Sequence, residues 1–535
     1  MASNEDLFRY TSGRWLCNEQ RRRALRYQQF NVDALKTVAV SSVGASGATG
    51  IRKLAEGRCN KVFLVELTEG RQVIARIPTP LSGPAHLVTA SEVATMEFLR
   101  NRLKLTQVPR VLSWSSRTEG IPVEAEYIIM DVADGVELHS VWHQLTMKQK
   151  LRVIYQWIQF EKKVIKAFSG CSGYGSLYYR KDIPTEDARD ISVDGQTDEE
   201  FVLGPSTIQM GFWEDRHGTP KDLKLDRGPW PDVPSYLQSI THTERAWIRR
   251  FAKAPSTDNR TFVAPWEPPL HLQIPQEHLH LLDQYDSVAK YLIPCDKQLH
   301  RPTLTLRDSN QGNIFLSREA LERDGTIELS AVIDWQHTAV LPLYLTSFIP
   351  RFIQEAGPAP GQAEEIFMKE KAYLRKAYHA LYHDTGYDVV WASALLFEDV
   401  SITQQLPSAA QFCWHGGYVK LKQLLQRVAA EWEDLVGLGI PCPLGPEPFS
   451  KEVVAQAEED DILWTEMETA REDVARAVGV EDDGWVCNDD YEKAVEANET
   501  QHVAWVESLG KEERDGLGGI DPADIWPFQG RVESH

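Results

Sequence analysis

The sequence predicts an α+β protein of two lobes, a small antiparallel β-sheet lobe with one helix and a large, mainly helical lobe. Three short strand patterns occur in succession before residue 80, and one amphipathic helix pattern follows them. Helical patterns dominate after residue 150. A chain of 535 residues with 42% hydrophobic content is long enough for two to four domains and supplies ample core.

Three strand patterns open the small lobe, at residues 51–55, 61–67 and 72–77. Turn-forming residues separate them, which favours a three-stranded antiparallel arrangement. The first turn contains a single glycine, Gly57, and the third strand carries Arg76. A glycine-rich segment at 44–50 precedes the strands, and we interpret it as a connector because no strand leads into it.

The helix pattern that follows runs from about residue 91 to 103 and places a charge on its apolar face. Glu92, Met96, Leu99 and Leu103 recur at spacings of four, three and four. A buried Glu92 requires a partner, and Arg76 is one candidate. The alternative is a capping box from Thr89 to Glu92, in which the glutamate folds back onto the helix start. We favour the ion pair, and both readings stay open at this point.

The large lobe follows a buried-strand pattern at 126–131 and a short loop. We expect helices at 151–168, 236–252 and 275–292. The last of these carries His278 and His280, with His271 close by. Alternate residues do not share a helix face, so we interpret these histidines as surface or packed residues rather than metal ligands.

A polar hairpin at residues 303–338 contains the most informative pattern. Asp308 follows an apolar approach, and Asn313 comes five residues later, directly before the strand-like run 314–316. After a charged turn around Asp324, a second apolar run ends in Asp334. Asp and Asn are also ordinary turn residues, so the pattern alone is a weak signal.

Phosphoryl transfer needs this set of side chains. One carboxylate orients the acceptor hydroxyl and takes its proton, while an Asn oxygen and a second carboxylate hold Mg²⁺. Protein kinases place these groups at the same spacing, in a large lobe that follows a small sheet lobe. In that arrangement the first turn lies over the nucleotide phosphates, and a basic residue on the third strand pairs with a helix glutamate. Gly57, Arg76 and Glu92 occupy those places in this chain.

Net charge, cysteine spacing and the distribution of apolar residues disfavour several other classes of protein. The formal charge of -21 disfavours nucleic acid or an anionic membrane surface as the main partner. Seven scattered cysteines without a CxxC pair argue against a disulfide framework or a thiolate metal site. The N-terminus lacks an apolar signal core, and no apolar run is long enough to span a bilayer. We therefore expect an intracellular protein, with a cytoplasmic location favoured.

Several motifs resemble the aminoglycoside phosphotransferase family, which has a protein-kinase-like fold, and in particular its fungal altered-inheritance-of-mitochondria group. They are YTSGRW at 10–15, KLAEG at 53–57, VIARIP at 73–78, SEVATM at 91–96, GNIF at 312–315 and IDWQH at 333–337. The resemblance implies phosphorylation of a small-molecule acceptor with ATP and Mg²⁺, and it makes a mitochondrial location possible.

The resemblance also implies roles for individual residues. Asp308 matches the catalytic aspartate, Asn313 and Asp334 match the metal ligands, and Glu92 matches the helix glutamate. Arg76 stands where the family has a phosphate-binding lysine, and its planar fork is not equivalent to an ammonium group.

Leu306 replaces the histidine that the family usually has two residues before the catalytic aspartate. This departure, Arg76 and the single glycine of the first turn motivate an alternative function, a catalytically weak pseudokinase-like binding or scaffold protein. A protein-kinase activity is disfavoured, because no Ala-Pro-Glu segment follows Asp334.

These readings divide the chain into four parts. We expect an N-terminal arm at 1–35, a small nucleotide-binding lobe at 36–133, a large catalytic and substrate lobe at 134–445 and an acidic helical extension at 446–535. The large lobe contains an insertion at 180–235, which we expect to be irregular because it is rich in Asp, Gly, Pro and Trp.

Overall fold

A computed structural model describes residues 4–168, 170–193, 195–208, 223, 225–255, 260–306, 308–346, 349–383, 401–445 and 449–529. The strands are β1 (Arg14–Trp15), β2 (Ala48–Glu56), β3 (Asn60–Leu67), β4 (Gln72–Pro78), β5 (Val111–Ser115), β6 (Tyr127–Met130), β7 (Val136–Glu137), β8 (Ser176–Tyr179), β9 (Arg189–Val193), β10 (Gln196–Gly204), β11 (Pro302–Leu304), β12 (Ile314–Leu316), β13 (Leu329–Val332), β14 (Val340–Pro342) and β15 (Trp485–Val486).

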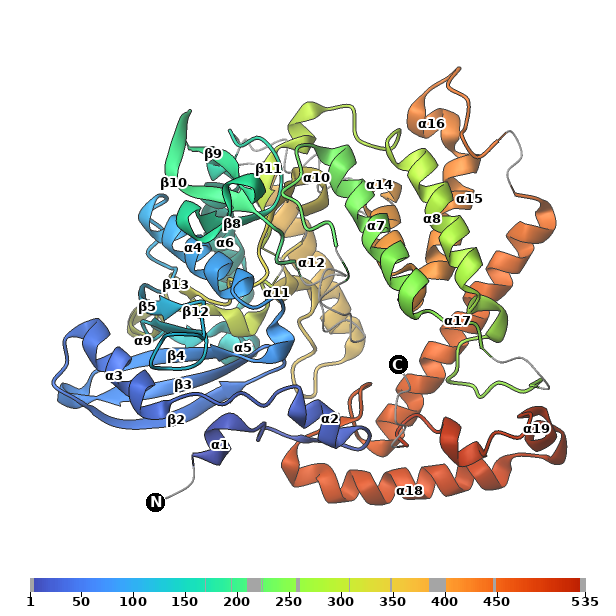
Figure 1. The fold of residues 1–535 in the computed structure, drawn as a ribbon, viewed down its shortest axis with the longest axis horizontal. Helices are drawn as coiled ribbons and strands as arrows, with labels where there is room; N and C mark the ends of the chain where they lie inside the picture. The colour runs from blue at the N-terminus through green and yellow to red at the C-terminus, as the bar shows by residue number, and fades with distance from the viewer. Residues whose placement is uncertain are drawn as a thin grey trace.

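The helices are α1 (Glu5–Phe8), α2 (Glu19–Ala24), α3 (Val32–Val43), α4 (Leu87–Asn101), α5 (Leu138–Val141), α6 (Met147–Ala167), α7 (Val233–Phe251), α8 (Pro275–Ala289), α9 (Arg318–Asp324), α10 (Leu343–Thr346), α11 (Arg351–Gln354), α12 (Glu364–His383), α14 (Ile402–Gln411), α15 (Tyr418–Ala430), α16 (Trp432–Val436), α17 (Lys451–Val478), α18 (Tyr491–Ser508) and α19 (Lys511–Gly516). Together they form the predicted α+β, two-lobed, kinase-like fold (Figure 1).

The small lobe is an antiparallel five-stranded sheet with the order β2-β3-β4-β6-β5. Its first three strands are the three that the sequence predicts. β4 lies at the centre, where Arg76 faces Val62 on one neighbouring strand and Ile128 on the other. A central strand is fixed by ladders on both sides, so Arg76 projects from one of the most constrained positions of the sheet.

The helix α4 covers this sheet and begins four residues earlier than predicted. Its N-cap residue, His86, makes no side-chain cap bond. Thr89 instead donates from its hydroxyl to Glu126 Oε2, at 2.5 Å. Thr89 is therefore inside the helix, and the capping box considered for Thr89 and Glu92 is not formed.

A further helix, α3, precedes the sheet in the chain and packs against its strands β2 to β5 (Figure 1). Asn31 caps it by accepting a bond from Ala34 N–H, and Gly44 ends it in the left-handed conformation. Its buried Leu35 and Ala39 join the core beneath the strands. The predicted boundary between residues 35 and 36 falls within this helix.

The large lobe contains two apolar cores, one around α6 and one around α7, α8, α14 and α15. α6 begins at a capping box in which Thr146 and Gln149 exchange hydrogen bonds. The predicted helices at 151–168, 236–252 and 275–292 correspond to α6, α7 and α8. None of the helices within the described residues is apolar enough over a sufficient length to cross a bilayer.

The insertion predicted to be irregular contains regular structure. β8, β9 and β10 form a three-stranded antiparallel sheet that lies against α4. The prediction was wrong for residues 189–193 and 196–204. β10 pairs with β9 on one side and with β8, which lies before the insertion, on the other, and this pairing stabilises the strands. The segment Phe212-Trp213-Glu214, on which the prediction partly rested, lies outside the described residues.

The hairpin at 303–338 also differs from its prediction in one detail. β12 and β13 pair antiparallel as expected, with Ile314 facing Val332. The connection between them is the short helix α9 rather than a simple charged turn. Ser317 caps the start of α9, and Gly325 ends it with a positive φ.

The acidic extension is helical, as predicted, and it contacts the large lobe and the N-terminal arm. α17 packs against α15 of the large lobe and then leads to α18, which lies along the lower edge of the molecule in Figure 1. β15, between these two helices, pairs antiparallel with β1 of the N-terminal arm. The extension is thereby connected to the arm that runs beside the small sheet.

Candidate active site

Asp308 lies in a short polar loop after β11, and three side chains donate to its carboxylate. Oδ1 accepts from Asn310 Nδ2 and from Arg351 Nη1, both at 2.8 Å. Oδ2 accepts from Asn313 Nδ2 at 3.0 Å. The carboxylate is therefore oriented by its own loop and by one residue from α11.

The side-chain amide of Asn313 has its nitrogen bonded to Asp308. Nδ2 donates to the carboxylate and also to the backbone carbonyl of Asp308, at 3.0 Å. Asn310 braces the same loop by accepting from the N–H groups of Gly312 and Asn313. Because the Asn313 nitrogen is committed to Asp308, its oxygen is the end available to a cation.

Asp334 follows β13 and has a φ of +61°, a conformation uncommon outside glycine. Its Oδ1 lies 3.5 Å from Arg76 Nη1. Desolvation raises the pKa of the carboxyl group, against the lowering influence of Arg76, and the charge of Asp308 raises it further. Oδ1 is buried without a hydrogen-bond partner among the described residues.

Arg76 and Glu92 form the predicted ion pair between β4 and α4. Arg76 Nη1 donates to Glu92 Oε1, and the two side chains are 8% and 2% exposed. Burial raises the pKa of Glu92 to about 7, although the facing guanidinium favours the charged carboxylate. Arg76 Nη2 is buried and has no hydrogen-bond partner within the described residues.

Asp308, Asp334 and Arg351 line one hollow of about 340 Å³. The other residues around it are Trp157, Ile208, Thr305, Leu306, Ser309, Val332, Ile333, Trp335, Gln336, His337 and Thr338. Arg76 reaches this hollow through its contact with Asp334, and Asn313 through its contact with Asp308. The structure thus brings together five of the six predicted site residues: Arg76, Glu92, Asp308, Asn313 and Asp334.

Gly57, the sixth, does not line this hollow. It lies in the turn between β2 and β3, where its N–H donates to the carbonyl of Asn60. The start of β3 does reach the site, because Asn60, its first residue, donates from Nδ2 to Gln336 Oε1 at 2.7 Å. A Cβ on Gly57 would meet no atom within 4 Å.

The donor atoms of the predicted metal ligands would suit Mg²⁺. Among the described residues no group of three or more His, Cys, Asp or Glu side chains could hold a metal ion. The oxygens of Asn313 and Asp334 are the hard donors that Mg²⁺ prefers. The unpartnered Oδ1 of Asp334 is a buried polar atom that such an ion would satisfy.

The histidines considered as alternative ligands are accounted for by packing. His278 is buried, with its two ring nitrogens against the carbonyls of Cys413 and Leu272. His271 pairs with Asp460 at 2.8 Å. These contacts agree with the prediction of packed histidines.

Sequence reasoning missed Arg351 and Glu161. Arg351 reaches Asp308 from 43 positions away, and no spacing in the sequence signals this contact. Glu161 on α6 accepts from the hydroxyl groups of Tyr378 and Tyr382, and burial raises its pKa to about 7. It lines a second hollow of about 260 Å³, which shares Leu306, Ser309 and Arg351 with the first.

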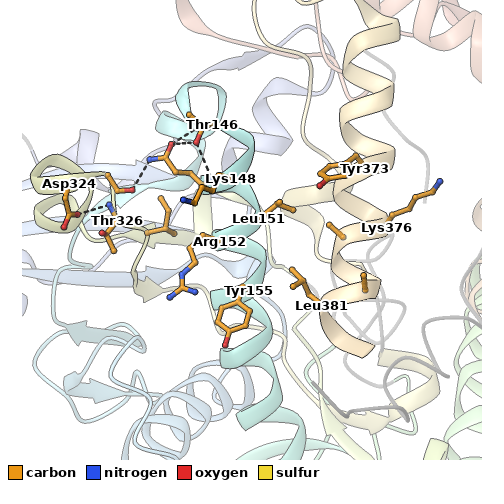
Figure 2. A pocket seen from close by; sticks show the side chains of 15 residues that line it. Thr146, Lys148, Leu151, Arg152, Tyr155, Asp324, Thr326, Tyr373, Lys376 and Leu381 are labelled. Atoms are coloured by element: carbon orange, nitrogen blue, oxygen red, sulfur yellow. Dashed lines mark hydrogen bonds between the residues drawn. The ribbon is translucent and has the colours of Figure 1, made fainter. Parts of the chain in front are cut away.

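A larger hollow of about 1080 Å³ lies elsewhere, between α6, α9 and α12. Figure 2 shows Arg152 and Tyr155 on one side of this groove and Tyr373 and Lys376 on the other. None of the predicted site residues lines it. Size alone therefore does not identify the active site.

The family model described as "Phosphotransferase enzyme family" matches residues 50–344, which include Arg76, Glu92 and the hairpin that carries Asp308, Asn313 and Asp334. The chain belongs to the phosphotransferase enzyme family. This match covers more than half of the chain, and the resemblance proposed from its motifs is confirmed.

Two relatives of this phosphotransferase-family chain are fungal. A subtelomeric hrmA-associated cluster protein of Aspergillus fumigatus is 30% identical over 503 residues, covering 85% of this chain and 93% of the relative. Altered inheritance of mitochondria protein 9, mitochondrial, of Clavispora lusitaniae is 23% identical over 438 residues, covering 74% of this chain and 70% of the relative.

Among solved structures, a streptomycin–ATP complex of an aminoglycoside phosphotransferase, APH(2")-IIa, matches with a TM-score of 0.36 and 14% identity, covering 75% of this chain and 99% of that one. A fructosamine-3-kinase of Thermobifida fusca, described as putative, matches with a TM-score of 0.36 and 13% identity, covering 75% and 100%. These scores are low, so family membership rests on the sequence matches.

Proposed function

We propose that this protein is an ATP- and Mg²⁺-dependent phosphotransferase that acts on a hydroxyl group of a small molecule. The observation that carries the proposal is that polar side chains from the two lobes contact one another where the lobes join. Asp308 and Asn313 come from the large lobe, Arg76 and Glu92 from the small lobe, and Asp334 contacts Arg76 from the hairpin.

Asp308 is proposed as the group that orients the acceptor hydroxyl and takes its proton. In this reaction the acceptor oxygen forms a bond to the γ-phosphorus of ATP while the bond to the β–γ bridging oxygen breaks. ADP leaves with that electron pair, and the hydroxyl proton passes to the Asp308 carboxylate. The hydrogen bonds from Asn310 and Asn313 support this role because they fix the carboxylate's direction.

Asn313 and Asp334 would hold Mg²⁺ through their oxygens. When bound, Mg²⁺ neutralises charge on the transferring phosphate. Arg76 is proposed to bind the nucleotide phosphates with its unpartnered Nη2, while Glu92 holds the other nitrogen. Gly57 is proposed to let the turn between β2 and β3 come close to those phosphates, because it carries no side chain.

One observation favours the second candidate function, a binding or scaffold protein of low catalytic activity. Arg351 donates to Asp308 Oδ1, so one of the two carboxylate oxygens is already engaged by a cation. Leu306 in place of a bracing histidine and the single glycine of the β2–β3 turn point in the same direction. The two candidates differ in whether nucleotide is bound and turned over.

Thermal unfolding with and without Mg·ATP separates the two candidates. The phosphotransferase proposal expects a rise in Tm with Mg·ATP that disappears in Asp334→Asn and persists in Asp308→Ala. Transfer to an acceptor, found by screening a library of hydroxyl metabolites, is expected to be lost in Asp308→Ala. The absence of a Mg·ATP-dependent shift in the natural protein would favour the scaffold function.

A mitochondrial location is proposed from the names of relatives such as the Clavispora lusitaniae protein, which include the word mitochondrial. The cytoplasmic location favoured by the sequence finds no support in the comparisons. Fractionation of cells that express the tagged protein, with matrix and cytosolic markers, tests this proposal directly.

A further inference from the structure

Arg351 is the first residue of α11, and its guanidinium bridges two carboxylates. Nη1 donates to Asp308 Oδ1 at 2.8 Å, and Nε donates to Glu355 Oε1 at 2.6 Å. The side chains of Arg351 and Asp308 are 44% and 38% exposed. Such a pair in contact with solvent contributes little to folding stability, so a substitution of Arg351 should leave the fold intact.

The remaining partners of Asp308 are fixed to its own loop. Asn310 also accepts from the N–H groups of that loop, and Asn313 also donates to the Asp308 carbonyl. Oδ1 of Asp308 already accepts two bonds, which fill its two lone pairs, so an acceptor hydroxyl that bonds to this oxygen must displace Asn310 or Arg351. Arg351 is the donor whose departure leaves the loop intact, because it belongs to α11 whereas Asn310 braces the loop itself.

Arg351 also stands at the boundary between the two hollows. It lines both, together with Leu306 and Ser309, whereas Asp308 lines only the larger one. Its backbone is anchored there, since its N–H donates to Ser309 Oγ at 3.1 Å and the next residue's N–H donates to the Ser309 carbonyl. A movement that exposes Asp308 therefore involves the Arg351 side chain and not α11.

We infer that Arg351 is a specificity-determining residue that prevents water from replacing the alcohol acceptor. Its guanidinium engages Oδ1 of Asp308 until an acceptor bonds to that oxygen, and it then keeps only its contact with Glu355. This inference rests on the proposed phosphotransferase function. Hydrolysis is the reaction it suppresses: the water oxygen bonds to the γ-phosphorus, the bond to the β–γ bridging oxygen breaks, ADP leaves with that electron pair, and a water proton passes to Asp308.

An acceptor can displace Arg351 where a single water cannot, because it binds through several groups at once. The second hollow offers Glu161, Thr346 and Glu355 beside Arg351. Carboxyl and hydroxyl groups of this kind recognise a compound with several hydroxyl groups. The acceptor's hydroxyl groups that are not phosphorylated supply binding energy, and this energy offsets the loss of the Arg351–Asp308 contact.

The test needs no knowledge of the acceptor, because it measures Mg·ATP hydrolysis by the full chain without one. Arg351→Gln is expected to raise the hydrolysis rate about tenfold or more, since a freed, positioned base contributes ~10²–10⁴-fold. Arg351→Lys, which keeps the charge, is expected to retain most of the suppression. The double variant Asp308→Asn/Arg351→Gln is expected to lose the increase.

Arg427→Gln is the matched control. Arg427 makes the same kind of ion pair one helical turn along, with Glu431 at 2.9 Å and 36% exposure, on α15 away from the site. It is expected to leave hydrolysis unchanged. An unchanged or lower rate in Arg351→Gln, with nucleotide binding intact, overturns the inference alone. Loss of nucleotide binding in the natural protein overturns the proposed function as well.

Discussion

Arg76 on β4 and Glu92 on α4 form a buried ion pair, and Arg76 also faces Asp334 from the large lobe. One guanidinium therefore connects the sheet, its covering helix and the hairpin that carries the candidate metal ligand. Removing Arg76 leaves the Glu92 carboxylate buried without a partner, which is costly, whereas removing Glu92 leaves Arg76 with Asp334 alone. This relationship makes the position of Asp334 depend on the small lobe.

The first prediction concerns Glu92 and pH. Its folded pKa of about 7 exceeds its usual value of 4.5, so the folded state binds the proton more tightly. The associated stabilisation is present below about pH 4.5 and is lost as pH rises to about 7, up to about 3 kcal/mol. The Tm of the natural protein minus that of Glu92→Gln should therefore decrease over this range.

Glu322→Gln is the control for this measurement, because the Glu322 side chain is 69% exposed on α9. Its Tm difference from the natural protein should be independent of pH. A difference for Glu92→Gln that stays constant or grows with pH would contradict the assignment of the raised pKa to Glu92.

The second prediction concerns the turn between β2 and β3. Gly57→Ala should leave the unliganded stability within about 0.5 kcal/mol, since the new methyl group meets no atom within 4 Å. It should weaken Mg·ATP binding severalfold if the turn approaches the phosphates. Calorimetric titration with Mg·ATP measures this, and an unchanged affinity would remove Gly57 from the nucleotide site.

The third prediction concerns Glu56, which ends β2 and joins the N-terminal arm to the sheet. Burial alone would raise the pKa of Glu56. Hydrogen bonds from Lys53, Lys61 and Thr11 outweigh this effect and hold the pKa at about 2. The side chains of Glu56 and Lys61 are both 0% exposed. Glu56→Gln leaves the buried ammonium group of Lys61 without a carboxylate partner and should cost about 3 kcal/mol of folding stability at pH 7.

Chemical denaturation measures this loss. Because the contribution is present above pH 4.5 and lost as pH falls towards 2, the difference between Glu56→Gln and the natural protein should shrink in acid. The double variant Glu56→Gln/Lys61→Met should recover much of the stability. If the double variant is as unstable as the single one, the loss does not come from the unpaired lysine.

The fourth prediction concerns the contact of the arm with the C-terminal extension. A Cβ on Gly13 would lie 2.5 Å from Trp485 Nε1 and 2.6 Å from the Val486 carbonyl. Gly13→Ala should therefore weaken the pairing of β1 with β15 by about 1–3 kcal/mol. Limited proteolysis should cut the extension about tenfold faster or more, because cleavage follows the population of the open form.

Gly357→Ala provides the matched control, since a Cβ there meets no atom within 4 Å. It should be cleaved at the rate of the natural protein. Equal cleavage of Gly13→Ala would mean that β1 and β15 do not hold the extension in place.

The sequence by itself determined the elements whose patterns are local. The three opening strands, the apolar stripe of α4 and the hairpin with Asp308, Asn313 and Asp334 could be predicted because alternation, helical spacing and turn chemistry act over a few residues. The same reasoning missed the strands β9 and β10, whose sheet is completed by β8 from outside the insertion. It also missed the start of α4, which has no side-chain cap, and the helix α9, although Ser317 and Gly325 cap that helix locally.

Only the tertiary structure decided which partner each charged group has. Glu92 pairs with Arg76 and does not form the capping box, since α4 begins before Thr89. The tertiary structure brought Arg351 to Asp308 across 43 positions and joined β1 to β15 across the whole chain. These contacts depend on how the lobes pack, because side chains distant in sequence meet only after the chain has folded.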